Sequence, residues 1–339
     1  MKAPDLARRL QQALAGRYTI RTELRGGGMS RVFRATDNAS GADVVLKILP
    51  PELAAAVSVA RFKREIDVAA RLEHPHIVPL IATGYADELP WFAMPYLGGA
   101  SLRERMGRSA PLQDAVRVLR EMASALAYSH ARGVVHRDIK PENVLFAGDV
   151  SMIADFGVAK ALDDAGDAFQ TQGGARTKLT TSRIALGTPA YMSPEQAAGD
   201  PTVDTRADIY AWGVVAYELL TGRAPFEGRS LIGQMAAHVR EAPEAISTRR
   251  PSLPVTLSAL VMRCLEKRPS DRPQRAEELV AELDGIAATL AESPTRSTTA
   301  ITEPPTARPI GTRFSVRMLS LAAVLLLVMS VLLVVRLRH

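Results

Sequence analysis

Two short strings near the middle of the chain hold the side chains best suited to chemistry. The first is His-Arg-Asp-Ile-Lys-Pro-Glu-Asn at 136–143, and the second is Asp-Phe-Gly at 155–157. Asp138 offers a carboxylate that could accept a proton from a substrate hydroxyl. Asn143 and Asp155 offer hard oxygen donors, which magnesium prefers. The two strings therefore suggest a site where a hydroxyl group meets a bound metal ion.

Together these strings resemble the signature of serine/threonine protein kinases. The resemblance covers roughly residues 17–285 and is closest to the bacterial, membrane-anchored Hanks-type (eukaryotic-like) kinases. Three further strings support it, at Gly27–Ser30, His74–Val78 and Ser193–Gln196. It implies an α+β, two-lobed protein-kinase fold, in which a small five-strand sheet lobe precedes a helical lobe. It also implies transfer of the γ-phosphate of ATP to protein Ser/Thr hydroxyls.

The resemblance assigns roles to four side chains. Asp138 is expected to orient the attacking hydroxyl and accept its proton. Lys140 is expected to steady the transferring phosphate, and tyrosine kinases usually differ at this position, so it favours the Ser/Thr class. Lys47, at the end of an apolar strand, is expected to hold the α- and β-phosphates while paired with Glu65 on a helix.

The same resemblance implies the cofactors. ATP is expected with Mg²⁺, which Mn²⁺ could replace, and the metal ligands are expected to be Asn143 and Asp155. The expected partners are proteins that carry Ser or Thr acceptors.

A glycine-rich turn between two predicted strands is expected to cover the phosphates, because glycine lets backbone N–H groups approach closely. Aligned on Val32, the family pattern G-x-G-x-x-G-x-V departs here, since Arg25 and Ser30 replace two glycines and only Gly27 matches. Met94 matches the gatekeeper position beside the adenine pocket. The residues expected to contact the nucleotide are Leu24, Arg25, Gly26, Gly27, Gly28, Met29, Ser30, Arg31, Val32, Val45, Lys47, Met94, Leu97 and Leu145.

The segment between Asp155 and Glu195 is long and polar, so it holds too little apolar surface to order itself. In the family, the arginine at the position of Arg137 binds a phosphate on this segment, and such a phosphate can order a loop. The expected autophosphorylation sites are Thr180, Thr181 and Ser182. Two scaffold roles are also implied: Glu195 pairs with Arg272, and Asp208 anchors the catalytic loop.

Hydrophobic periodicity predicts the strands and helices of the chain. Strands are expected at 17–24, 31–35, 44–49, 77–82 and 91–96, and helices at 56–72, 113–132, 208–221, 230–239, 256–266 and 275–290. The domains follow as an N-terminal amphipathic helix at 1–17, a kinase domain at 18–285 (small lobe 18–95, large lobe 96–285), a Ser/Thr/Pro-rich juxtamembrane linker at 286–317 and a transmembrane helix at 318–335.

Residues 318–335 carry no charge and are flanked by arginines. Eighteen helical residues span about 27 Å, just enough for a hydrocarbon core. We expect a single-pass protein of the cell membrane with a cytoplasmic kinase domain. The leucines of 1–17 recur every four residues, which predicts a helix packed on the small lobe, with a membrane-surface role as the alternative.

The composition bears on the expected partners and the expected redox compartment. The formal charge is +6, but the arginines are scattered, so nucleic-acid binding is not expected. The single cysteine, Cys264, fits a reducing compartment and a small buried hydrophobe. Kinase-domain dimerisation remains open. The rival functions are a catalytically inactive membrane-tethered pseudokinase scaffold and a small-molecule phosphotransferase.

Overall fold

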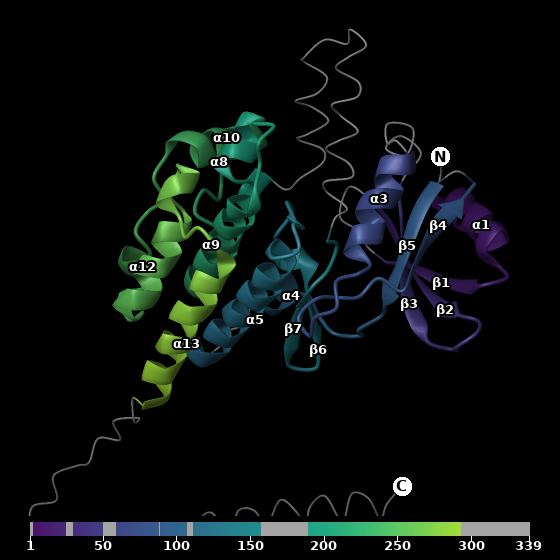
Figure 1. Cartoon of the computed structure of the whole chain (residues 1–339), viewed down its shortest axis with the longest axis horizontal. Coiled ribbons are helices and arrows are strands. Elements are labelled where there is room, and N and C mark those ends of the chain that lie inside the picture. Colours follow the sequence, from purple (N-terminus) through teal and green to yellow (C-terminus); the bar gives the residue numbers. More distant parts are fainter. Residues whose placement is uncertain are drawn as a thin grey trace, which may run out of the picture. The chain divides into compact units, whose positions relative to one another are not determined.

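The structure is a computed structural model that describes residues 3–24, 30–49, 59–87, 89–106, 111–156 and 189–292. Strands dominate its first part and helices its second (Figure 1). The two-lobed fold with a five-strand sheet is the one predicted. The elements of the small lobe are α1 (Ala3–Leu14), β1 (Tyr18–Leu24), β2 (Arg31–Asp37), β3 (Asp43–Ile48), α3 (Val59–Ala69), β4 (Ala82–Ala86) and β5 (Leu89–Pro95).

The small-lobe sheet is antiparallel, with strand order β1-β2-β3-β5-β4. Its central strand β3 holds three consecutive buried apolar residues, Val44–Leu46, directly before Lys47. Lys47 lies opposite Val32 on β2 and Phe92 on β5. A central position flanked on both sides by hydrogen-bonded strands fixes the backbone of Lys47. Its side chain is therefore presented from a rigid element.

Helix α1 packs on the small-lobe sheet, as its leucine spacing predicts. Leu6, Leu10 and Leu14 are buried against Tyr18, Phe33, Leu46 and Trp91, among others, in one apolar cluster. The helix lies beside β1 and β4 (Figure 1). Burial of the three leucines satisfies the apolar face of this helix within the chain.

The fourth strand was predicted in the wrong place. The apolar run at 77–82 reads as a strand, but the strand that pairs with β5 is β4, at Ala82–Ala86. The start of the run pairs elsewhere: Ile77 bridges to Ile153, and the Val78 N–H donates to the Ile153 carbonyl at 2.9 Å. These residues therefore join the small lobe to strand β7 (Val150–Ile153) instead of widening the sheet.

Helices α5 and α9 lie at the centre of the helical lobe. The Trp212 indole N–H on α9 is fully buried and donates to the Leu119 carbonyl on α5 at 3.0 Å. Cys264 is also fully buried, as predicted. The elements of this lobe are α4 (Leu102–Arg105), α5 (Leu112–His130), β6 (Val144–Ala147), β7 (Val150–Ile153), α8 (Pro194–Ala198), α9 (Thr205–Thr221), α10 (Leu231–Arg240), α11 (Ile246–Arg249), α12 (Val255–Cys264) and α13 (Ala276–Glu292).

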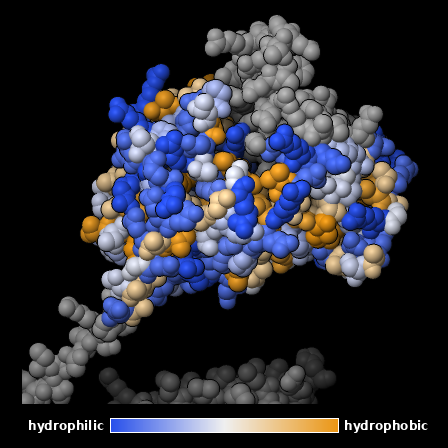
Figure 2. Space-filling view, in the orientation of Figure 1, coloured by the Kyte–Doolittle hydropathy of each residue, from blue (hydrophilic) through white to orange (hydrophobic). Residues whose placement is uncertain are grey.

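The last helix runs further than expected. Helix α13 continues to Glu292, so the first part of the predicted linker, residues 286–292, is helical. The rest of the linker and the predicted span at 318–335 lie outside the described residues. Within the described ranges, no helix is long and apolar enough to cross a membrane. Hydrophilic side chains cover much of the face drawn in Figure 2, with apolar residues scattered among them.

Candidate active site

Asp208 anchors the backbone of the catalytic loop, as predicted. This carboxylate on α9 is fully buried and accepts hydrogen bonds at 2.8 Å from the backbone N–H groups of His136 and Arg137. It also accepts one at 2.8 Å from the His130 ring. Burial alone would raise the pKa of Asp208, but the hydrogen bond and charge of His130 and the His136 N–H together hold that pKa below its usual range.

His136 links the catalytic loop to the residue before Asp155. The Asp138 N–H donates to the ring Nδ1 at 3.1 Å, and the ring Nε2 lies 2.8 Å from the Ala154 carbonyl. Because Nδ1 accepts, Nε2 must carry the proton that is donated to Ala154. This neutral ring therefore ties together the two strings that the sequence singled out.

Asp138 lies in a polar cluster of its own loop. Its Oδ2 accepts from Lys140 Nζ at 2.6 Å and from Asn143 Nδ2 at 3.1 Å. Asn143 Nδ2 also donates to the Asp138 carbonyl at 2.8 Å, which closes the loop on itself. The Asp138 side chain keeps 21% of its surface exposed, so a hydroxyl could still reach it.

Lys47 reaches across from β3 to Asp155. Its Nζ lies 2.5 Å from Asp155 Oδ2, and both side chains are mostly buried. Asp155 has a left-handed backbone, with φ of 70°, which is uncommon for a residue other than glycine and is typical of functional sites. Glu65 lies on α3 with a half-buried side chain. The Lys47–Glu65 pair stays a prediction.

The donor set fits a magnesium ion. Asp155 Oδ1 is buried and has no hydrogen-bond partner among the described residues, so it is available as a ligand. The bonds from Asn143 Nδ2 orient the amide and leave its Oδ1 as the second ligand. No group of three or more His, Cys, Asp or Glu side chains in the described ranges could hold a metal. Mg²⁺ commonly uses one or two protein ligands with substrate phosphates and water, so two suffice.

The predicted apolar walls of the nucleotide pocket come together. Val32, Val45 and Met94 are buried in one cluster with Val78 and Ala154. Partly buried residues pack against this cluster, namely Leu24, Tyr96, Leu97, Leu145 and Met152. Four members were not among the predicted nucleotide residues, namely Val78, Tyr96, Met152 and Ala154. Ala154 could have been inferred, because it directly precedes Asp155 at the end of a strand, whereas Val78 was assigned to the misplaced fourth strand.

Other predicted residues are placed differently or lie outside the description. Arg31 pairs with Glu23 on the neighbouring strand, and Ser30 directly precedes β2. The glycine-rich turn at 25–29 and the predicted phosphosites Thr180, Thr181 and Ser182 lie outside the described residues.

The segment that follows the activation loop is well anchored. Arg272 is almost fully buried and makes two hydrogen bonds of 2.8 Å to Glu195, which confirms the predicted ion pair. Ser193 caps α8: the Gln196 N–H donates to its hydroxyl, and the Gln196 side chain accepts from its N–H. Gln196 Nε2 also donates to the Arg137 carbonyl at 2.8 Å. The segment that holds α8 is therefore joined directly to the catalytic loop.

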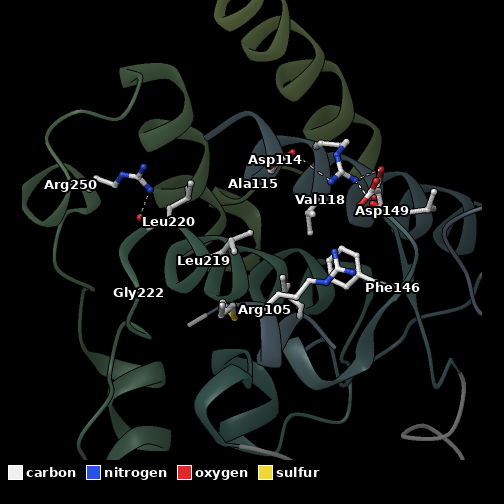
Figure 3. A pocket seen from close by; sticks show the side chains of 15 residues that line it. Arg105, Asp114, Ala115, Val118, Phe146, Asp149, Leu219, Leu220, Gly222 and Arg250 are labelled. Carbon is white, nitrogen blue, oxygen red and sulfur yellow. Dashed lines mark hydrogen bonds and ion pairs between the residues drawn. The ribbon is translucent and has the colours of Figure 1, made fainter. Parts of the chain in front are cut away.

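A cavity of about 820 Å³ lies elsewhere on the helical lobe, between α4, α5 and the β6–β7 hairpin (Figure 3). Arg105 and Phe146 face one another there, with the guanidinium carbon 3.6 Å from the ring centre. None of the lining residues is among the predicted catalytic, metal or nucleotide residues. The cavity is thus separate from the site.

Known proteins are similar to this chain in sequence. The protein kinase domain family matches residues 18–282. The chain is 37% identical over 297 residues to the serine/threonine-protein kinase pkn3 of Myxococcus xanthus, covering 84% of this chain and 53% of that protein. It is 39% identical over 278 residues to the serine/threonine-protein kinase PknB of Mycobacterium leprae, covering 80% and 43%. The chain thus spans about half the length of the curated relatives it matches.

Solved structures of a kinase domain are also similar to this chain. The crystal structure of the Mycobacterium tuberculosis PknI kinase domain superposes with a TM-score of 0.61 at 29% identity, covering 79% of this chain and 95% of that one. A point mutant of the same domain also has a TM-score of 0.61. The family match covers most of the chain and both kinds of relative are kinases. This chain belongs to the protein kinase domain family.

Proposed function

We propose that this chain is a serine/threonine protein kinase that transfers the γ-phosphate of ATP to Ser or Thr hydroxyls of proteins. The observation that carries the proposal is the Asp138 carboxylate, which is held by Lys140 and Asn143 on a loop fixed by Asp208. The relatives named above are serine/threonine kinases, which supports the same class of acceptor.

In this mechanism the anchored catalytic loop holds Asp138 and Lys140, and strand β3 holds the backbone of Lys47. Asp138 accepts the proton of the substrate hydroxyl and orients its oxygen. Lys140, next to Asp138 Oδ2, places positive charge where the transferring phosphate arrives. The Lys47 ammonium group, which contacts Asp155 in this structure, would move to contact the α- and β-phosphates.

Magnesium, which manganese could replace, would be held by Asn143 Oδ1 and Asp155. Bound there, it would offset the negative charge of the phosphates. Asp155 is prepared for this role because its Oδ1 is buried and has no partner among the described residues.

The rival is a catalytically inactive scaffold. Lys47, Asp138, Asn143 and Asp155 are all present, and each makes a hydrogen bond or ion pair to another of the four or to Lys140. A scaffold has no need of this constellation. Incubating the purified chain with labelled ATP and either Mg²⁺ or Mn²⁺, then mapping the phosphosites, separates the two. A scaffold transfers no label to itself or to a generic protein substrate.

We propose further that residues 318–335 anchor the chain in the cell membrane with the kinase domain in the cytoplasm. The support for the span is the uncharged stretch of 18 residues, whereas the arginines on both sides do not by themselves decide the orientation. Deleting residues 314–339 should move the protein from the membrane pellet to the soluble fraction and leave its kinase activity intact. A truncated protein that still pellets would instead implicate α1.

We also propose that the kinase phosphorylates Thr180, Thr181 or Ser182 in its own activation segment, with Arg137 as a partner of the phosphate. A phosphate adds about −1.5 to −2 charge and can pair with an arginine. Replacing the three hydroxyl residues with alanine should lower activity several-fold. An active preparation without phosphate at 178–184, together with an unimpaired triple variant, would remove this proposal. Dimerisation of the kinase domain stays a prediction, which analytical sedimentation would test.

A further inference from the structure

A buried histidine on α10 holds the backbone just before α8. His238 is fully buried, and its ring Nε2 lies 3.0 Å from the Ala190 carbonyl oxygen. Ala190 belongs to a short 3₁₀ helix, Pro189–Tyr191, against which α10 packs. Helices α8 and α10 lie side by side in the helical lobe (Figure 1). One side chain of α10 therefore reaches the segment that leads into α8.

The two contacts of the His238 ring define its proton. A carbonyl oxygen can only accept, so Nε2 carries the proton that is donated to Ala190. Burial, together with the charge of Lys267, lowers the pKa of His238 to about 4, so the ring is neutral at pH 7 and holds no second proton. Nδ1 must therefore accept, and the Tyr210 hydroxyl donates to it at 2.9 Å.

Lys267 begins a chain of hydrogen bonds that ends on the Ala190 carbonyl. Its Nζ lies 3.3 Å from the Tyr210 hydroxyl oxygen. Burial and the nearby charge of Arg272 lower the pKa of Lys267 to about 8, so the ammonium group is still largely protonated at pH 7 and donates. The bonds from Lys267 to Tyr210 and from Tyr210 to His238 run in one direction, so each polarises the next.

The helix that carries Tyr210 also anchors the catalytic loop. Tyr210 and Asp208 lie two residues apart on α9. Asp208 accepts from the Arg137 N–H at 2.8 Å, whereas Gln196 on α8 donates to the Arg137 carbonyl at 2.8 Å. The residue directly before Asp138 is therefore held by α9 on one side and by α8 on the other. The hydrogen-bond chain fixes the segment from which α8 starts.

We propose that His238 is a positioning residue, which through its Nε2–H holds the segment at 189–191 and thereby keeps α8 and the catalytic loop in the position that phosphate transfer needs. The inference rests on the kinase activity proposed above. Tyr210, itself bonded by Lys267, keeps Nδ1 as the acceptor of the ring. None of these three residues is among the predicted nucleotide residues, so the chain should affect turnover and leave ATP binding unchanged.

The kinetic test compares two substitutions of His238 in the whole chain. His238→Leu removes the donor and keeps an apolar side chain of similar size. Its kcat should fall by at least about 10-fold, while its KM for ATP stays within about 2-fold. His238→Gln, whose amide can donate to the Ala190 carbonyl, should recover most of the turnover. Equal losses of turnover in the two variants, or an unchanged kcat in His238→Leu, would overturn the proposal.

A matched pair of tyrosines keeps the test decisive if His238→Leu does not fold. Tyr210 and Tyr217 are both fully buried on α9, and the Tyr217 hydroxyl donates to the Glu244 carbonyl at 3.0 Å. Each substitution by phenylalanine removes one hydroxyl hydrogen bond. Tyr210→Phe should lower kcat by at least about 3-fold, the factor that one such bond supplies, whereas Tyr217→Phe should not. Equal turnover in the two variants would count against the chain.

Nitrogen NMR of the histidine rings tests the chain without phosphate transfer. With ¹⁵N-labelled histidine, the unchanged protein should show His238 protonated at Nε2 and unprotonated at Nδ1, and the signals that vanish in His238→Gln assign this ring. Tyr210→Phe should shift the Nδ1 signal because that nitrogen loses its donor, whereas Tyr217→Phe should leave it in place. A His238 ring that carries its proton on Nδ1 contradicts the proposal.

The His136 ring reports the position of the catalytic loop in the same spectra, because its Nδ1 accepts from the Asp138 N–H at 3.1 Å. Its signals should move in His238→Leu and, to a smaller extent, in Tyr210→Phe, and stay unchanged in Tyr217→Phe. If no protein transfers phosphate, the proposed kinase function fails, while these shifts still support the positioning role. His136 signals that do not move in either His238→Leu or Tyr210→Phe contradict that role.

Discussion

Asp208→Asn should both destabilise the chain and slow its chemistry. The buried carboxylate accepts three hydrogen bonds: its Oδ1 from the Arg137 N–H, and its Oδ2 from the His136 N–H and the His130 ring. An asparagine has a single acceptor oxygen. If that oxygen replaces Oδ2, the new NH₂ group faces the Arg137 N–H, so one donor points at another.

The size of the effect follows from these contacts. A hydrogen bond to a charged group contributes about 1.5–3 kcal/mol, and leaving a buried donor unsatisfied costs about 1–3 kcal/mol. Removing a buried charge offsets part of this loss, so we expect a net destabilisation of about 3 kcal/mol. The same N–H groups hold the backbone directly before Asp138, so turnover should fall by at least about 10-fold through misplacement of that carboxylate.

Stability is read from the urea midpoint of tryptophan fluorescence, since Trp212 lies on the same helix as Asp208. The matched control is Asp284→Asn, whose ion pair with Arg120 leaves 51% and 42% of the two side chains exposed. Breaking an exposed pair should cost no more than about 1 kcal/mol. An Asp208→Asn protein with the urea midpoint and turnover of the unchanged chain would refute the anchoring role of Asp208.

Three further predictions concern other parts of the structure. Gly213→Ala should lower the free energy of unfolding by about 2 kcal/mol, because its new Cβ would lie 2.7 Å from the Cβ of Cys264, whereas Gly285→Ala, which meets nothing within 4 Å, should be neutral or stabilising in the same denaturation assay. Burial holds the pKa of His238 at about 4, below its ordinary 6.5, so the folded state binds fewer protons than the unfolded state between these values, and lowering the pH from 7 to 5 should cost about 2 kcal/mol. His238→Gln should flatten that pH dependence of the urea midpoint, and an unchanged slope would contradict the burial argument. Lys47→Met should reduce phosphate transfer by at least about 100-fold in a radiolabel assay while the melting temperature changes little, and a fully active variant would remove Lys47 from the mechanism.

Much of the site could be predicted because it is local in sequence. Asp138, Lys140 and Asn143 lie within six residues, so one loop places them together. Asp208 and the Glu195–Arg272 pair are distant in sequence, and only the resemblance to kinases allowed their contacts to be predicted. The apolar walls were predicted for the same reason, since β-strand alternation alone does not separate a pocket wall from a core residue.

The structural features that were not predicted from the sequence depend on contacts between elements. The run at 77–82 has the composition of a strand, but Ile77 and Val78 pair with Ile153 of the other lobe, which no local pattern indicates. The partner of Lys47 depends on the approach of β3 to Asp155.

Phosphate transfer by the purified chain, compared with Asp138→Asn, tests the central claim most directly. Asp284→Asn serves as the control for the loss of a carboxylate. With labelled ATP and Mg²⁺, the unchanged chain and the control should place phosphate on Ser and Thr of a protein substrate. Asp138→Asn should be slower by at least about 100-fold, which corresponds to about 2.7 kcal/mol of barrier. Equal rates for Asp138→Asn and the unchanged chain, or no transfer by any of the three proteins, would contradict the assignment of a kinase active site to this loop.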